Sequence, residues 1–185
     1  MTLGDDFDVT LEAARAGAEW AWTAIYRDLA APVTGYLRAR GATEPEDLTG
    51  EVFLQLVRDL NAFSGDERDF RAWVFTIAHH RMLDATRSAG RRPAAPVDHR
   101  DLAEETANVD TAETALRSLA VDRVRRLIRR LSPDQQDVLL LRLFGDLTVD
   151  EVALAVGKRP GAVKALQRRG LAALKREISR EGVTL

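Results

Sequence analysis

The sequence contains no cysteine and only three histidines, His79, His80 and His99. Disulfide bonds, thiolate metal sites and a cysteine nucleophile are therefore excluded. His79 and His80 are adjacent, which places them on different sides of a helix and does not match the spacing of metal ligands. The sequence also lacks a glycine-rich phosphate-binding loop. We therefore expect no metal site, no cofactor and no enzymatic activity.

Long hydrophobic runs are also absent. No apolar stretch approaches the roughly 20 residues that a helix needs to span a bilayer. The N-terminal residues MTLGDDFDVT are acidic and lack the basic segment and apolar stretch of a secretory signal. The sequence therefore predicts a cytoplasmic protein that does not insert into membranes.

Strand signals are scarce, and helical periodicity dominates the chain. A first helix is expected from Trp20 to Arg40, with Gly41 ending it. Pro32 should either kink this helix or begin a second one. The apolar stripe of the segment consists of Trp22, Ile25, Tyr26, Leu29, Val33 and Leu37.

Two further helices are expected in the first half of the chain. One runs from Glu46 to Leu60, and the turn signal Phe63-Ser64-Gly65-Asp66 separates it from a helix over Glu67–Ser88, which Gly90 should stop. Their apolar positions are Leu48, Val52, Phe53, Leu56, Val57 and Leu60 in the first, and Phe70, Trp73, Val74 and Ile77 in the second. Because Phe70 and Trp73 lie on this stripe, we interpret them as core residues rather than base-stacking residues.

Charge is distributed unevenly, although the formal net charge is only -2. The net charge is -8 over residues 1–69, +4 over 70–92, -5 over 93–116 and +7 over 117–185. Two basic segments could therefore grip a polyanion, or they could be solvated helix faces. Residues 93–113 are proline-containing, acidic and without apolar periodicity, which is typical of a flexible linker.

The last third of the chain has the pattern of a helix-turn-helix. Helicity resumes near Thr114 with the stripe Val121, Val124, Leu127, Ile128 and Leu131. Ser132-Pro133 should begin a helix that Gly145 closes. Thr148 and Glu151 form a capping box for a short helix over Val149–Val156, and Gly157 provides the turn. Pro160 begins the final helix, with Val163, Leu166, Leu171 and Leu174 on its apolar side.

A short helix, a glycine turn and a basic second helix can place that second helix in the major groove of DNA. Lys164, Arg168 and Arg169 lie about one turn apart on it, and Lys158 and Arg159 precede it. Arginine reads guanine or holds phosphate, whereas lysine mostly holds phosphate. The alternative is a three-helix interaction domain with a basic surface.

At this point the sequence resembles the extracytoplasmic-function sigma factors, the two-domain promoter-specificity subunits of bacterial RNA polymerase. The resemblance covers about residues 20 to 176. It rests on PEDLTGEVFLQL, FSGDERDFRAWVFTIAHHRMLD, RRLSPDQQDVLLLRLFGDLTVDEVALAVG and RPGAVKALQRRGLAALKRE. It implies an all-α protein of two small helical domains joined by a flexible acidic linker, the C-terminal one a helix-turn-helix. Residues 1–92 would be sigma region 2, 93–113 the linker and 114–185 sigma region 4.

The resemblance also implies roles for individual residues. The core-polymerase docking set would be Asp47, Leu48, Glu51, Val52 and Gln55. The set that melts and reads the −10 element would be His79, His80, Arg81, Asp84 and Arg87. The set that reads the −35 element would be Lys158, Arg159, Lys164, Ala165, Arg168 and Arg169. The sequence departs from the family at His80, where many relatives carry asparagine in a pattern like IARNRLID, and His80 is our candidate for contact with a flipped-out base.

The implied partners are core RNA polymerase, through its clamp coiled coil and flap, promoter DNA and an anti-sigma factor. The acidic linker would thread toward the active centre and mimic nucleic acid, or it would be a disordered spacer. The alternatives to a sigma factor are a stand-alone helix-turn-helix regulator and a protein-interaction module. The docking motif favours a sigma factor over the regulator, and the basic helix favours it over the interaction module.

Overall fold

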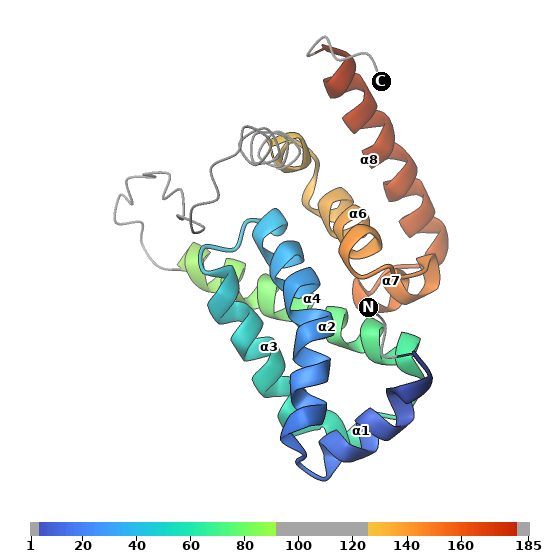
Figure 1. Cartoon of the computed structure of the whole chain (residues 1–185). Helices are drawn as coiled ribbons and strands as arrows, with labels where there is room; N and C mark the ends of the chain where they lie inside the picture. Colours follow the sequence, from blue (N-terminus) through green and yellow to red (C-terminus); the bar gives the residue numbers. More distant parts are fainter. Residues whose placement is uncertain (1–3, 92–125, 181–185) are drawn as a thin grey trace, which may run out of the picture.

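The computed structural model describes residues 4–91 and 126–180, and every regular element in these two ranges is helical (Figure 1). The elements are a 3-10 helix over Gly4–Asp6, α1 (Phe7–Arg15), α2 (Glu19–Arg40), α3 (Pro45–Asp59), a 3-10 helix over Leu60–Ala62, α4 (Glu67–Arg91), a helical turn over 126–129, α6 (Pro133–Phe144), α7 (Val149–Ala155) and α8 (Pro160–Arg180). We call residues 4–91 the N-terminal domain and residues 126–180 the C-terminal domain. The prediction of an all-α protein is confirmed.

The helix α2 crosses the N-terminal domain as one continuous element, although Pro32 lies inside it. The alternative in which Pro32 begins a second helix is therefore wrong. Burial of apolar side chains on both sides of the proline, such as Leu29 and Val33, holds the helix together despite the missing amide. Gly41 ends α2 as predicted, in the left-handed conformation at φ 96° that glycine adopts readily.

The helices α3 and α4 lie close to their predicted positions. The predicted end of the third helix at Gly90 is wrong, because α4 continues to Arg91. Two residues assigned to apolar stripes, Tyr26 and Val57, are more than half exposed. Phe70 is buried, and Trp73 is half-buried and stacked on Phe63 with ring centroids 5.1 Å apart, which confirms both as core residues.

The three helices of the C-terminal domain begin and end where local signals predict. The amide of Ser132 donates to Oε1 of Gln135 at 3.2 Å at the start of α6. In the capping box of α7, the Thr148 amide donates to Glu151 Oε2 at 2.5 Å, and the Glu151 amide donates to Thr148 Oγ1 at 3.3 Å. Gly157 makes the turn between α7 and α8 at φ 63°.

The final helix packs closely on α6, and part of its predicted apolar side differs from expectation. Val163 and Leu166 are buried, whereas Leu171 is 52% exposed. Gly170 faces α6 so closely that a Cβ atom there would lie 2.9 Å from Cδ1 of Leu139. A larger residue at this position would therefore have to displace the end of the Leu139 side chain.

The two domains pack against each other rather than standing apart. Helix α2 lies along α6, and α4 lies against α7 (Figure 1). Leu127, Ile128 and Leu131 are buried as the periodicity predicts. The predicted linker at 93–113, and the start of the next helix near Thr114 with Val121 and Val124, lie outside the described residues. None of the helices in 4–91 and 126–180 is long and apolar enough to cross a membrane.

Candidate nucleic-acid interface

The exposed face of α4 carries three of the five residues predicted for −10 recognition. His80, Asp84 and Arg87 recur at helical spacing and are exposed, and Arg87 Nη1 lies 3.3 Å from Asp84 Oδ1. The His80 ring therefore projects into solvent from a rigid helix. A flat ring flanked by a carboxylate and a guanidinium is suited to contact an unpaired base and its phosphate.

Arg81 points away from this face and joins α4 to α3. Its Nη2 and Nε donate to Oε1 of Gln55 at 2.8 and 3.0 Å. Its Nη1 lies 3.7 Å from Oε2 of Glu51. One residue predicted to read DNA thus contacts two residues predicted to dock on polymerase, so the two surfaces are coupled through a single side chain.

His79 is only 3% exposed and lies in the interface between the domains. Its Nδ1 is 3.0 Å from the Tyr36 hydroxyl and 3.7 Å from Oδ1 of Asp137 on α6. Burial lowers the pKa of His79, with contributions from His80 and Arg40, against the opposing charge of Asp137. Burial, followed by the charge of Asp137, raises the pKa of the Tyr36 hydroxyl. In this arrangement His79 is a buried side chain with almost no access to solvent.

The outer face of α8 carries the predicted −35 residues. Arg159, Lys164, Arg168 and Arg169 are exposed, and Ala165 is half-buried beside them. The buried residues Val163, Leu166 and Gly170 occupy the opposite side. The hydrophobic packing of α8 therefore sets which cations face outward.

Lys158 precedes α8 and is already engaged within the domain. Its Nζ lies 2.9 Å from Oδ2 of Asp134 at the start of α6. The lysine side chain is 32% exposed and the aspartate side chain 54% exposed, so the pair is open to water. A phosphate that binds Lys158 must compete with this carboxylate.

The exposed face of α3 contains part of the predicted docking set. Asp47 and Glu51 are exposed, and Gln55 and Leu48 are half-buried. Val52 has no exposed surface, so it supports the core behind this face. Sequence reasoning missed Leu54, which is 64% exposed between these polar side chains. Its position three residues after Glu51 was the signal that could have identified it.

Sequence reasoning also missed the polar residues at the centre of the interdomain interface. Nε of Arg40 donates to Oδ1 of Asp137 at 2.6 Å, and its Nη1 donates to Oε1 of Gln136 at 3.4 Å. The exposed fractions of the Arg40 and Asp137 side chains are 12% and 9%. Nothing local identifies this pair, because the two residues are 97 positions apart in the sequence.

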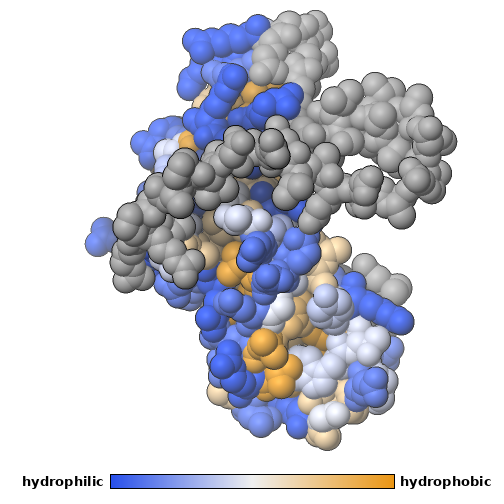
Figure 2. Space-filling view, turned by 90° about the vertical axis from the view of Figure 1, so that its left-hand side faces the viewer, coloured by the Kyte–Doolittle hydropathy of each residue, from blue (hydrophilic) through white to orange (hydrophobic). Residues whose placement is uncertain are grey.

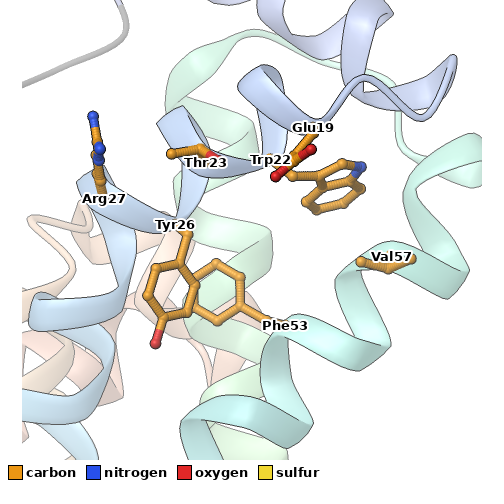
Figure 3. A pocket seen from close by; sticks show the side chains of 7 residues that line it. All are labelled: Glu19, Trp22, Thr23, Tyr26, Arg27, Phe53 and Val57. Carbon is orange, nitrogen blue, oxygen red and sulfur yellow. The ribbon is translucent and has the colours of Figure 1, made fainter.

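An apolar hollow of about 580 Å³ opens between α2 and α3, away from the predicted DNA-reading residues. Figure 2 shows hydrophobic surface gathered low on one face, where the N-terminal domain lies. Side chains from both helices line the hollow, and the rings of Tyr26 and Phe53 pack with centroids 4.8 Å apart (Figure 3). The lining residues are Glu19, Trp22, Thr23, Tyr26, Arg27, Phe53 and Val57.

Comparison with known proteins places this geometry in a family. Residues 24–92 match Sigma-70 region 2, and residues 122–174 match Sigma-70, region 4. The chain is 32% identical to the ECF RNA polymerase sigma factor SigD of Mycobacterium tuberculosis over 190 residues, covering 98% of this chain and 89% of SigD. The chain belongs to the extracytoplasmic-function sigma factors. The exposed face of α4 lies within region 2 of this sigma factor, and α8 from Pro160 to 174 lies within region 4.

Other relatives support the same assignment. The sigma factor is 34% identical to the ECF RNA polymerase sigma factor BldN of Streptomyces coelicolor over 168 residues. These cover 90% of this chain but only 63% of BldN, so the chain spans less than two thirds of that relative. The structure of CnrH in complex with the cytosolic domain of CnrY shares the fold, with a TM-score of 0.69 at 22% identity, covering 95% of this chain and 99% of that one. In 4–91 and 126–180 no group of three or more histidine, aspartate or glutamate residues is arranged to hold a metal ion.

Proposed function

We propose that this sigma factor binds core RNA polymerase and directs promoter-specific initiation through exposed faces of three helices. One observation carries the proposal. A polar face on α3, a DNA-directed face on α4 and a cationic face on α8 occur in one chain that matches sigma-70 regions 2 and 4. A stand-alone helix-turn-helix regulator has no need of the α3 face. The role is one of binding, without a catalytic step of its own.

The α3 face docks on the clamp coiled coil of the polymerase. Asp47, Glu51 and Leu54 are exposed on the same side of the helix. An apolar side chain surrounded by polar ones is the arrangement of a small interface, with a dry centre and a polar rim. Gln55 completes this face, and Val52 and Leu48 support it from the core. Exposed Leu143 and Leu154 give the C-terminal domain a second apolar contact, which we assign to the flap.

The α4 face captures the −10 element. His80 stacks on or hydrogen-bonds an unstacked base once the duplex opens, and Arg87 holds the adjacent phosphate. Asp84 orients Arg87 through the 3.3 Å contact between them. Arg81 acts mainly as a bridge to α3, and His79 can reach DNA only if the two domains separate.

The α8 face reads the −35 element in the major groove. Lys164, Arg168 and Arg169 face outward, and Lys158 and Arg159 lie where the helix begins. Ala165 lies between them and allows a close approach to a base edge or a thymine methyl group. Because α8 projects from a packed helix-turn-helix, its side chains meet DNA in a preset register.

We also propose a protein partner that acts as an anti-sigma factor. The support is the fold shared with CnrH, which is seen in complex with the cytosolic domain of CnrY. Such a partner, like polymerase and promoter DNA, would meet this sigma factor in the cytoplasm. Co-purification of the sigma factor with a candidate partner, and loss of transcription when that partner is added, would test this part.

The central test is run-off transcription with purified sigma factor, core polymerase and promoter fragments selected from genomic DNA. We expect specific transcripts only when sigma factor and core polymerase are combined. Leu54→Asp places a charge at the centre of the docking face and should abolish the transcripts. Val9→Asp makes the same change at an equally exposed position on α1 and should leave them intact. Identical transcripts with and without the sigma factor would refute the proposal.

A further inference from the structure

The apolar hollow between α2 and α3 has no role in the proposed function. Trp22 and Tyr26 line it from α2, and Phe53 lines it from α3 (Figure 3). The Tyr26 and Phe53 rings pack with centroids 4.8 Å apart and a 54° tilt between their planes. Trp22 makes no ring contact within the described ranges, so its indole stands across a gap from that pair. Aromatic rings therefore border the hollow on two sides.

These rings are held in position by the fold itself. Nε1 of Trp22 donates to the Ala14 carbonyl at 3.1 Å, which fixes the indole against α1. Phe53 is only 8% exposed and is anchored in the core of the N-terminal domain. Tyr26 is more than half exposed and leans on Phe53. Because the rings are already placed on packed helices, binding of a ligand would require little ordering of the protein.

The charges around the hollow favour a cation. Glu19 places a carboxylate beside the Trp22 ring at the edge of the hollow (Figure 3). This carboxylate makes no hydrogen bond or ion pair with residues 4–91 or 126–180. The faces of aromatic rings also carry partial negative charge. Arg27 lines the other end, and Figure 3 shows its guanidinium turned away from the rings. A cation would pair with Glu19, whereas a neutral ligand would cover the carboxylate without giving it a partner.

The lack of hydrogen-bond acceptors in the hollow narrows the kind of cation. An ammonium group with N–H bonds needs an acceptor for each of them. Besides Glu19, the lining side chains offer only the hydroxyls of Thr23 and Tyr26, and the Tyr26 hydroxyl is directed away from Trp22 (Figure 3). A quaternary ammonium group has no N–H bonds, and its methyl groups can pack on ring faces. The volume of about 580 Å³ is in the range of small-molecule sites, so a whole small molecule fits.

We propose that this hollow is a binding site for a small soluble molecule with a quaternary ammonium head group, of the class to which choline belongs. The head group lies between the indole of Trp22 and the ring pair of Tyr26 and Phe53, with Glu19 as its counter-ion. The inference goes beyond the proposed function, which requires only polymerase, promoter DNA and a protein partner.

Choline and the neutral alcohol in which carbon replaces its nitrogen separate charge from shape. Each would be titrated into the full-length protein, with the indole N–H signal of Trp22 followed by nuclear magnetic resonance. Choline should give a saturable shift, and the neutral alcohol should bind at least about fivefold more weakly because it lacks the cation–π attraction. A shift that grows linearly with choline concentration, or equal affinities for the two compounds, would overturn the proposal. A peptide with trimethyl-lysine that binds more tightly than choline would overturn the assignment to a free small molecule.

Three variants at exposed positions test the contribution of individual groups. Tyr26→Leu keeps an apolar side chain but removes one ring face, so it should weaken choline binding by about two- to thirtyfold. Glu19→Gln removes the counter-ion and should weaken binding by up to about fivefold, as for an exposed ion pair. Asp8→Asn removes a carboxylate of α1 that does not line the hollow, and it should leave the affinity unchanged. Wild-type affinity in Tyr26→Leu, or equal losses in Glu19→Gln and Asp8→Asn, would refute the site.

Discussion

The capping box of α7 provides a test of how local chemistry supports the DNA-reading domain. Helix α7 has seven residues, well below the length at which a helix is stable alone. The Glu151 amide donates to Thr148 Oγ1 at 3.3 Å, which satisfies one of the amides that the first turn of the helix leaves without a backbone partner. Thr148→Ala removes this bond and leaves the reciprocal bond from the Thr148 amide to Glu151 in place.

The loss of an N-cap hydroxyl costs about 1 kcal/mol. For a chain of this size, that free energy lowers the unfolding temperature by about 2–4 °C. Thermal and urea unfolding followed by circular dichroism at the helical band would measure both quantities. Thr148→Ser keeps the accepting oxygen and should stay within about 0.3 kcal/mol of the wild type. Equal destabilisation by alanine and serine, or none by alanine, would refute the capping argument.

Four further predictions concern DNA binding and pH. Asp134→Asn should free Lys158 and tighten binding to a −35 duplex by about 1.4- to 5-fold, because an exposed ion pair is worth about 0.2–1 kcal/mol. Unchanged binding in a fluorescence-anisotropy titration would contradict this prediction. Arg168→Ala should weaken the same binding and lower the slope of log affinity against log salt concentration by about one. Equal slopes for the variant and the wild type would show that the side chain faces away from phosphate. His80→Ala should slow open-complex formation more than closed-complex binding in a permanganate footprint, and equal losses would count against a −10 role. Because burial lowers the pKa of His79, this side chain should contribute fully to folding stability above the ordinary histidine value of 6.5. Its contribution should fall as the pH drops below that value, by at most about 1.4 kcal/mol per pH unit, and a free energy of unfolding that is independent of pH between 5 and 8 would refute this.

Local signals predicted most element boundaries because they act within a few residues. Gly41 and Gly157 end or turn the chain with positive φ, and Thr148 reaches an amide three residues away. The same local reasoning was wrong at Pro32 and at Gly90. At Pro32 the packing of residues on both sides outweighs the missing amide, which a local rule does not include.

The candidate sites were predicted less evenly, because residue type does not determine which side of a helix is covered. His79 and His80 are adjacent and chemically identical, yet one is buried against α6 and the other is exposed. Val52 and Leu54 are likewise close in sequence, and only Leu54 reaches the surface of α3. The helices that pack alongside decide each case, namely α6 for His79, and α2 and α4 for Val52.

The sequence by itself determined the helices, the helix-turn-helix and the cationic outer face of α8, since caps, turns and periodicity are short-range properties. Its motifs also indicated the sigma factor family. Only the tertiary structure revealed the contact between the domains, because the pairing of Arg40 with Asp137 depends on the approach of α2 and α6 across 97 positions. That approach converts two ordinary surface charges and one predicted DNA-binding histidine into a buried cluster, and burial changes what each of them can do.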